Sequence, residues 1–136
     1  MIQKVGISTS RGAEFIDITR DVQEVVEASK TKSGVCHVFV PHTTAAVTLN
    51  ENADPSVAAD IITQLDEFVP RQGNYRHSEG NAHAHIKASL IGNSVTLLID
   101  GGDLVLGTWQ GLFFCEFDGP RSRTLLVKIV PDLHTR

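Results

Sequence analysis

The stretch HSEGNAHAHIKASLIG, residues 77–92, decides the fold, because it can form either a strand or a helix. In an extended chain, alternate residues share a face. The odd-numbered residues from 77 to 85 would then project together, with three histidines and a glutamate among them. A helix would separate the same side chains, so its conformation determines which of them can converge.

The ends of the stretch favour the helix. Asn81 is a residue type that caps helix N-termini, and Gly92 is one that ends them. Between them, alanine and larger apolar residues recur at helical spacing. We therefore predict a helix over 81–91, in which His83 and His85 lie about 200° apart and do not share a site.

Working towards the N-terminus, KVGIST (4–9) and AEFIDITR (13–20) are predicted to form a strand pair. DVQEVVEASKTKSG (21–34) has helical periodicity, with Asp21 as the expected N-cap and Gly34 beyond its end. VCHVFVPHTTAAVTLNE (35–51) is a long β-type run interrupted at Pro41. A second helix is predicted to start at Asp54-Pro55 and to stop before Pro70.

Residues 71–80 lack periodicity and are predicted to form a loop. Beyond residue 92, three β-type runs are separated by the turns GGD and DGPR: SVTLLID (94–100), LVLGTWQGLFFCEF (104–117) and SRTLLVKIV (122–130). Strands, then helices, then further strands predict an α+β fold over residues 1–136. We expect a single compact domain with an antiparallel β-sandwich-like core and two to three helices.

The composition excludes several functional classes. The net charge of -4 and the pI of about 5.8 argue against nucleic-acid binding. No apolar run approaches the roughly 20 residues of a membrane helix, and the N-terminus lacks the apolar segment of a signal peptide. We expect a cytoplasmic protein with no membrane partner, for which a small phosphorylated metabolite remains a possible ligand. Cys36 and Cys115 lie in apolar runs and are expected to be buried free thiols.

Polar residues that end apolar elements are the candidates for chemistry. His42 follows a predicted strand, and Glu51 precedes a helix. Each has a simple structural explanation, as a strand end or a capping group. Together with the histidines of residues 77–85 they could also hold a divalent ion such as Zn²⁺. Spacing alone does not decide this, because the chain contains no HExxH motif.

Three stretches of the sequence resemble the motifs of a known family: PHTTAAVTLNENADP (41–55), YRHSEGNAHAHIKASLIG (75–92) and LGTWQGLFFCEFDGPR (106–121). In this order and chain length they resemble the YjbQ-like family, which is named for secondary thiamine-phosphate synthase activity. The family pattern usually reads EGNADAH where this chain has EGNAHAH. His83 therefore replaces an acidic position, whereas His77, Glu79, Asn81 and His85 match.

The resemblance implies a homotrimer with a polar pocket in which histidines hold a metal ion, Zn²⁺ or Mg²⁺. It also implies a weak synthase activity, which joins hydroxymethylpyrimidine diphosphate to thiazole phosphate and releases pyrophosphate. Such a reaction needs positive charge on the leaving group and exclusion of water. The expected residues are His42, His77 and His85 for metal; His85, Glu79 and Glu51 for catalysis; and Asn81, Trp109, Gln110, Arg121 and Lys87 for substrate.

Two alternatives use the same polar residues. A metal-dependent phosphohydrolase would activate water instead of a second substrate. A non-catalytic trimeric protein would only bind the metal or the metabolite. We predict that His42, His77 and His85 converge, with Glu51 or Glu79 nearby, and that the site lies at or near a subunit boundary. His37 is expected to be a packed or interface residue.

Overall fold

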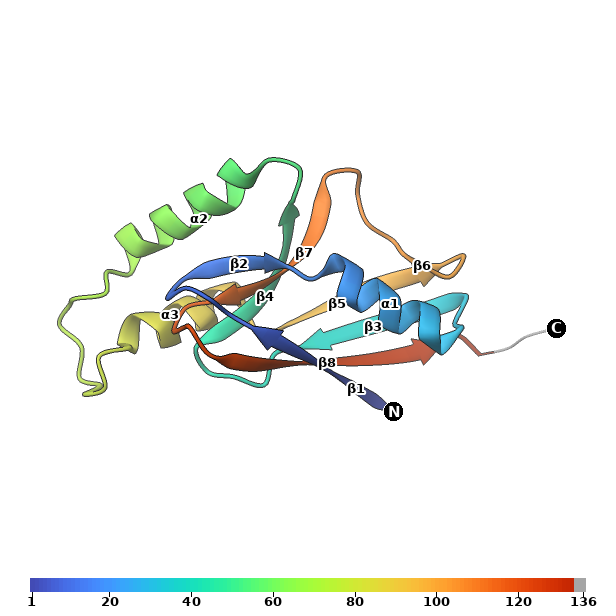
Figure 1. Ribbon diagram of the computed structural model, residues 1–136, viewed down its shortest axis with the longest axis horizontal. Helices are drawn as coiled ribbons and strands as arrows, with labels where there is room; N and C mark the ends of the chain where they lie inside the picture. The colour runs from blue at the N-terminus through green and yellow to red at the C-terminus, as the bar shows by residue number, and fades with distance from the viewer. Residues whose placement is uncertain (134–136) are drawn as a thin grey trace.

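Two antiparallel sheets face each other in the computed structural model, which describes residues 1–133 (Figure 1). The larger sheet has five strands in the order β1-β8-β3-β5-β6. Their bounds are Ile2–Ser8 for β1, Ser122–Pro131 for β8, Ser33–Phe39 for β3, Ser94–Asp100 for β5 and Asp103–Leu104 for β6. The smaller sheet has the order β2-β7-β4, with bounds Glu14–Asp17, Gln110–Glu116 and Ala45–Glu51.

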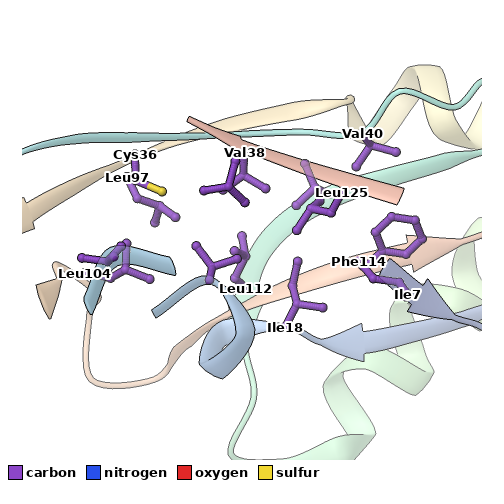
Figure 2. Close-up of a cluster of buried hydrophobic side chains, with 14 of the residues drawn as sticks. Ile7, Ile18, Cys36, Val38, Val40, Leu97, Leu104, Leu112, Phe114 and Leu125 are labelled. Carbon is purple, nitrogen blue, oxygen red and sulfur yellow. The ribbon is translucent and has the colours of Figure 1, made fainter. Parts of the chain in front are cut away.

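The main core lies between the two sheets (Figure 2). Alternation along each strand sends every second side chain inward. Cys36 and Val38 of β3 thus meet Leu112 and Phe114 of β7, and all four are buried. Helix α1, Thr19–Ser29, adds Val22 and Val26 to this layer. Truncating Phe114 to alanine here would cost about 3–5 kcal/mol, the usual range for a buried aromatic residue.

A second apolar layer covers the other face of the smaller sheet. Helices α2, Pro55–Phe68, and α3, Ala82–Ile91, lie on this side of the molecule (Figure 1). They pack against the β7 side chains that point away from the main core. Phe113 and Cys115 contact this layer, and Ala84 and Ala88 of α3 supply small buried surfaces. The molecule is therefore a single α+β domain with three helices among the described residues, as predicted.

The predicted helix over 81–91 is confirmed, because α3 begins at Ala82 and its C-cap is Gly92. Helix α2 starts as predicted, since the Asp54 side chain accepts a hydrogen bond from the Ser56 amide at 2.9 Å and Pro55 opens the helix. The start of α2 therefore depends on local side-chain chemistry, which the sequence contains in full.

Two local predictions are wrong. KVGIST and AEFIDITR do not pair, because β1 pairs with β8 in one sheet and β2 with β7 in the other. Helix α1 begins at Thr19 instead of after Asp21. The carboxylate of Asp17 accepts from the Thr19 amide at 2.9 Å, and this bond starts the helix earlier. Gly34 does lie beyond the helix end, as expected, but it belongs to β3 and the C-cap is Lys30.

The two cysteines are buried free thiols, as expected. Burial raises the pKa of the Cys36 thiol to about 11, and it raises that of Cys115 further, so burial disfavours the thiolate form of both. Among the described helices none is both long and apolar enough to cross a membrane.

Candidate anion-binding site

A buried ion pair organises one end of the sandwich. Glu116, at the end of β7, and Arg123, at the start of β8, are 0% and 4% exposed. Arg123 Nε donates to Glu116 Oε1 at 2.8 Å, and Arg123 Nη2 donates to Glu116 Oε2. Two parallel bonds of this kind fix both planes, so the pair is a rigid base for the loops around it.

Further hydrogen bonds tie three loops to this pair. Thr9, after β1, donates to Glu116 Oε1 at 2.8 Å and accepts from the Arg121 amide at 2.9 Å. Thr44, before β4, accepts from Arg123 Nη2 at 2.9 Å. The amide of Asp118 donates to Glu116 Oε2 at 2.9 Å. Residues far apart in the chain are therefore held at one point.

An open pocket of about 480 Å³ lies over this network. Its polar lining combines two arginines with hydroxyl, amide and imidazole groups: His42, Thr43, Thr44, Asn93, Arg121 and Arg123. Arginine, hydroxyl and amide donors are the groups that proteins use to bind phosphate. The pocket is therefore suited to an anion.

His42 enters this pocket as a neutral imidazole. Its Nε2 accepts a hydrogen bond from the Thr124 amide at 2.9 Å, which places the ring proton on Nδ1. Partial burial, followed by the positive charge of Arg123, lowers the pKa of His42 below its usual 6.5. The Nδ1–H group is then a donor, and Nε2 has no lone pair left for a metal ion.

Asn81 connects the start of α3 to the turn before β8. It occupies the N-cap position, but its side chain does not cap the helix. Instead its amide donates to Asp118 Oδ2 at 2.8 Å. Asp118 also binds Arg121, whose Nη2 lies 3.1 Å from the same oxygen and whose Nε donates to the Asp118 carbonyl. Asn81 thus positions the half-exposed Arg121 through Asp118.

Lys87 forms a partly buried ion pair with Asp66. Its side chain is buried, and Nζ donates to Asp66 of α2 and lies 3.4 Å from His83 Nδ1. Burial, and then the charges of Lys87 and Arg71, lower the pKa of His83. His83 is itself buried on α3, one turn before Lys87.

His77 and His85 do come together, with ring centroids 5.1 Å apart in an edge-to-face arrangement. Glu79 Oε1 lies 3.8 Å from His77 Nε2. His42 is not with them, since it is held by Thr124. Within residues 1–133, no three histidine, cysteine or carboxylate side chains are grouped closely enough to hold a metal ion. The predicted convergence of the three histidines is therefore not found within one chain.

Glu51, Trp109 and Gln110 lie at the opposite end of the smaller sheet. The register pairs Glu51 with Gln110 at one end and Ala45 with Glu116 at the other. Six steps at about 3.3 Å separate these ends by roughly 20 Å. Trp109 is 63% exposed there, and Gln110 accepts from the Gly107 amide. One chain therefore does not join them to the anion pocket.

His37 is exposed on β3, where Nδ1 lies 3.1 Å from Thr96 Oγ1. It is not packed in the core, so the interface alternative remains a prediction.

The sequence reasoning missed Glu116, Thr9, Thr44 and Asp118. Glu116 carried a usable signal, because it is a charged residue in the apolar run LFFCEF (112–117). A carboxylate in such a run needs a buried partner. Nothing local identifies that partner as Arg123.

The fold and pocket define an α+β domain with an arginine-lined polar pocket at one end of a β-sandwich. The family model for UPF0047 protein YjbQ-like matches residues 3–132, and this chain belongs to that family. The chain is 51% identical over 132 residues to UPF0047 protein MJ1081 of Methanocaldococcus jannaschii, covering 97% of this chain and 96% of that protein. It is 45% identical to UPF0047 protein YugU of Bacillus subtilis, covering 96% and 99%.

Solved structures show the same fold. A crystal structure of an uncharacterized conserved protein of the YjbQ/UPF0047 family from Clostridium acetobutylicum superposes with a TM-score of 0.93. Its sequence is 52% identical, and the match covers 94% of this chain and 99% of that one. A YbjQ-like protein from Sulfolobus solfataricus also gives a TM-score of 0.93, at 38% identity over 97% of each chain.

Proposed function

We propose that this protein is a transferase that joins hydroxymethylpyrimidine diphosphate to thiazole phosphate and releases pyrophosphate. The observation that carries the proposal is the pocket over the buried pair of Arg123 and Glu116, which Arg121 and His42 also line. Both substrates and both products carry phosphate groups, and fixed arginine, hydroxyl and imidazole donors suit each of them. The sequence resemblance supplies the choice of this reaction among other phosphate chemistries.

In this reaction the thiazole nitrogen forms a bond to the pyrimidine methylene carbon. The carbon–oxygen bond to the diphosphate breaks, and pyrophosphate leaves with the electron pair. Negative charge therefore increases on the leaving oxygen, and donors fixed in advance stabilise it most. Arg121 is half-exposed and held by Asp118, so it is placed to bind the leaving group. The Nδ1–H of His42 supplies a neutral donor beside it.

The second half of the site is proposed to come from a neighbouring subunit of a homotrimer. Glu51, Trp109 and Gln110 lie roughly 20 Å from the anion pocket within one chain, as the strand rise requires. A symmetric ring brings opposite ends of neighbouring chains together. Trp109, which is largely exposed here, would then cover the reactive methylene and exclude water. His85 and Glu79 remain proposed catalytic residues.

No step is assigned to a metal ion. His77 and His85 supply two imidazoles on one face, and Glu79 adds a carboxylate near His77. Within residues 1–133 this set does not amount to a metal site. A Zn²⁺ or Mg²⁺ ion held here would need ligands in addition to these side chains.

The test is to incubate the purified protein with both precursors and to follow the products by mass spectrometry. The variants are Arg121→Ala and His85→Ala, and Arg20→Ala on the exposed face of α1 is the matched control. We expect thiamine phosphate with wild type and the control, and less with the two site variants. Pyrophosphate or phosphate release without ligation would indicate a phosphohydrolase. Tight binding without turnover would indicate a metabolite-binding protein.

A further inference from the structure

A hollow lies away from the anion pocket, between α1 and the edge strand β1. It measures about 680 Å³. Val5 and Ile129 form part of its floor, and Val25 and Ala28 of α1 line its wall. The smaller sheet is not among its lining residues, so this part of the larger sheet's inner face opens to the surface.

Strand β1 forms the free edge of the five-stranded sheet beside this groove (Figure 1). Its seven residues pair only with β8. Its backbone has no second strand as partner among residues 1–133. The sequence IQKVGIS has no proline, and Lys4 is its one charged residue. Proteins usually protect edge strands with prolines, bulges or charges, and on β1 Lys4 is the one such device, which leaves most of the edge open to pairing.

The charges that line the groove determine which strand can pair with β1. Asp21 and Glu24 of α1 line the groove, and Glu24 is held at the rim by an exposed ion pair with Arg20. Lys4 lines the groove from the β1 side, where its parity is opposite to that of Gln3 and Val5. The wall that α1 presents to an incoming strand is therefore acidic and apolar.

We infer that this groove binds an extended basic peptide, which adds as a strand to the edge of β1. Main-chain bonds to β1 would supply register, and alternate side chains would enter the groove. Lysine or arginine at those positions would meet Asp21 and Glu24, and the methylene groups of the same side chains would lie against Val25 and Ala28.

A second copy of this chain suits the groove less well. The inward positions of β1 are Met1, Gln3, Val5 and Ile7, none with a cationic side chain. A copy pairing β1 against β1 would therefore place no positive side chain against the acidic wall. This difference favours a separate peptide whose inward positions are basic.

The test uses the full chain and a fluorescein-labelled seven-residue peptide of alternating lysine and valine. Anisotropy should show saturable binding to wild type. The double variant Asp21→Lys, Glu24→Lys should bind at least about tenfold more weakly, because two attractive contacts become repulsive. Glu27→Lys is the matched control, since Glu27 lies on the same helix but outside the groove lining, and its affinity should stay near that of wild type.

Two further measurements separate strand addition from adsorption of a cationic peptide. Methylation of alternate peptide nitrogens keeps the charges but removes backbone donors, and it should abolish binding. Hydrogen exchange should show new protection of β1 amides in the complex. Equal binding of the methylated peptide, no binding of the lysine–valine peptide, or a β1-paired dimer that excludes the peptide would each overturn the inference. None of these assays depends on the transferase activity.

Discussion

Arg123 Nε lies 2.8 Å from Glu116 Oε1, and neither side chain is more than 2% exposed. This pair joins the ends of β7 and β8 and supports the pocket in which Arg121 and His42 lie. Breaking it leaves one buried charge without a partner, which costs far more than the net worth of the pair itself.

We expect Arg123→Ala to lower the free energy of unfolding by about 3–5 kcal/mol. The exposed pair of Arg20 and Glu24 is the control, and Arg20→Ala should change stability by less than about 1 kcal/mol. Urea unfolding at pH 7 measures both. Replacing both buried partners, as in Glu116→Leu with Arg123→Met, should recover most of the loss. A double variant as unstable as the single one would contradict this account.

Acid should weaken the fold through Glu116. Burial alone would raise the pKa of Glu116, but the hydrogen bonds from Arg123, the Asp118 amide and Thr9 outweigh it, so the pKa lies below the usual 4.5. A carboxylate with a lowered folded pKa stabilises the protein above its unfolded pKa. That contribution is lost as the pH falls below about 4.5 towards the folded pKa.

The measurement is the free energy of unfolding as a function of pH for wild type and Glu116→Gln. The variant should be less stable at pH 7, and its loss of stability below about pH 4.5 should be shallower. Parallel curves for the two proteins would show that other carboxylates dominate the acid response.

The sequence predicts local features of this molecule better than it predicts how they meet. The start of α2 at Asp54 and the end of α3 at Gly92 follow from capping chemistry within a few residues. The separation of β1 and β2 into different sheets cannot be predicted in this way. The alternation of apolar residues shows which face of a strand is buried, but it does not show which strand is its neighbour.

The candidate site shows the same division. The sequence identified His42 and Arg121, and the structure places both in one pocket. It also grouped Glu51 with them, although the register of β4 places Glu51 at the far end of the sheet. Glu116 was missed, since its partner Arg123 is on another strand and pairs with it only in the folded state.

His42 should be a neutral Nδ1–H tautomer at pH 7. Its Nε2 accepts from the Thr124 amide, and its pKa is lowered by burial and by Arg123. Long-range proton–nitrogen NMR correlations report the tautomer directly, and a pH series gives the pKa. The urea-unfolded protein, in which the imidazole should titrate near 6.5, is the reference. A protonated Nε2 at neutral pH would contradict the hydrogen bond to Thr124.

Arg121 should contribute to anion binding without supporting the fold. Its side chain is 50% exposed, so Arg121→Ala should leave the unfolding free energy nearly unchanged. Loss of one charge-assisted contact should weaken binding of pyrophosphate by about 1.5–3 kcal/mol. Titration calorimetry on wild type, Arg121→Ala and the surface control Arg20→Ala measures this. Equal affinities in all three would remove Arg121 from the pocket's binding residues.

The stability that the Lys87–Asp66 pair provides should depend on the residue at position 83, where this chain has histidine and the family pattern has an acid. Asp66→Asn leaves the buried ammonium of Lys87 beside a neutral His83 and should lower the free energy of unfolding by about 2–4 kcal/mol. This loss is smaller than for a fully buried pair, because the Asp66 side chain is 38% exposed. Adding His83→Asp should restore much of this, since position 83 lies one turn from Lys87 on α3. Asp60→Asn, at an exposed site on α2, controls for the loss of charge. Urea unfolding of the single and double variants forms a complete cycle. A double variant no more stable than Asp66→Asn would show that position 83 does not substitute for Asp66 as the partner of Lys87.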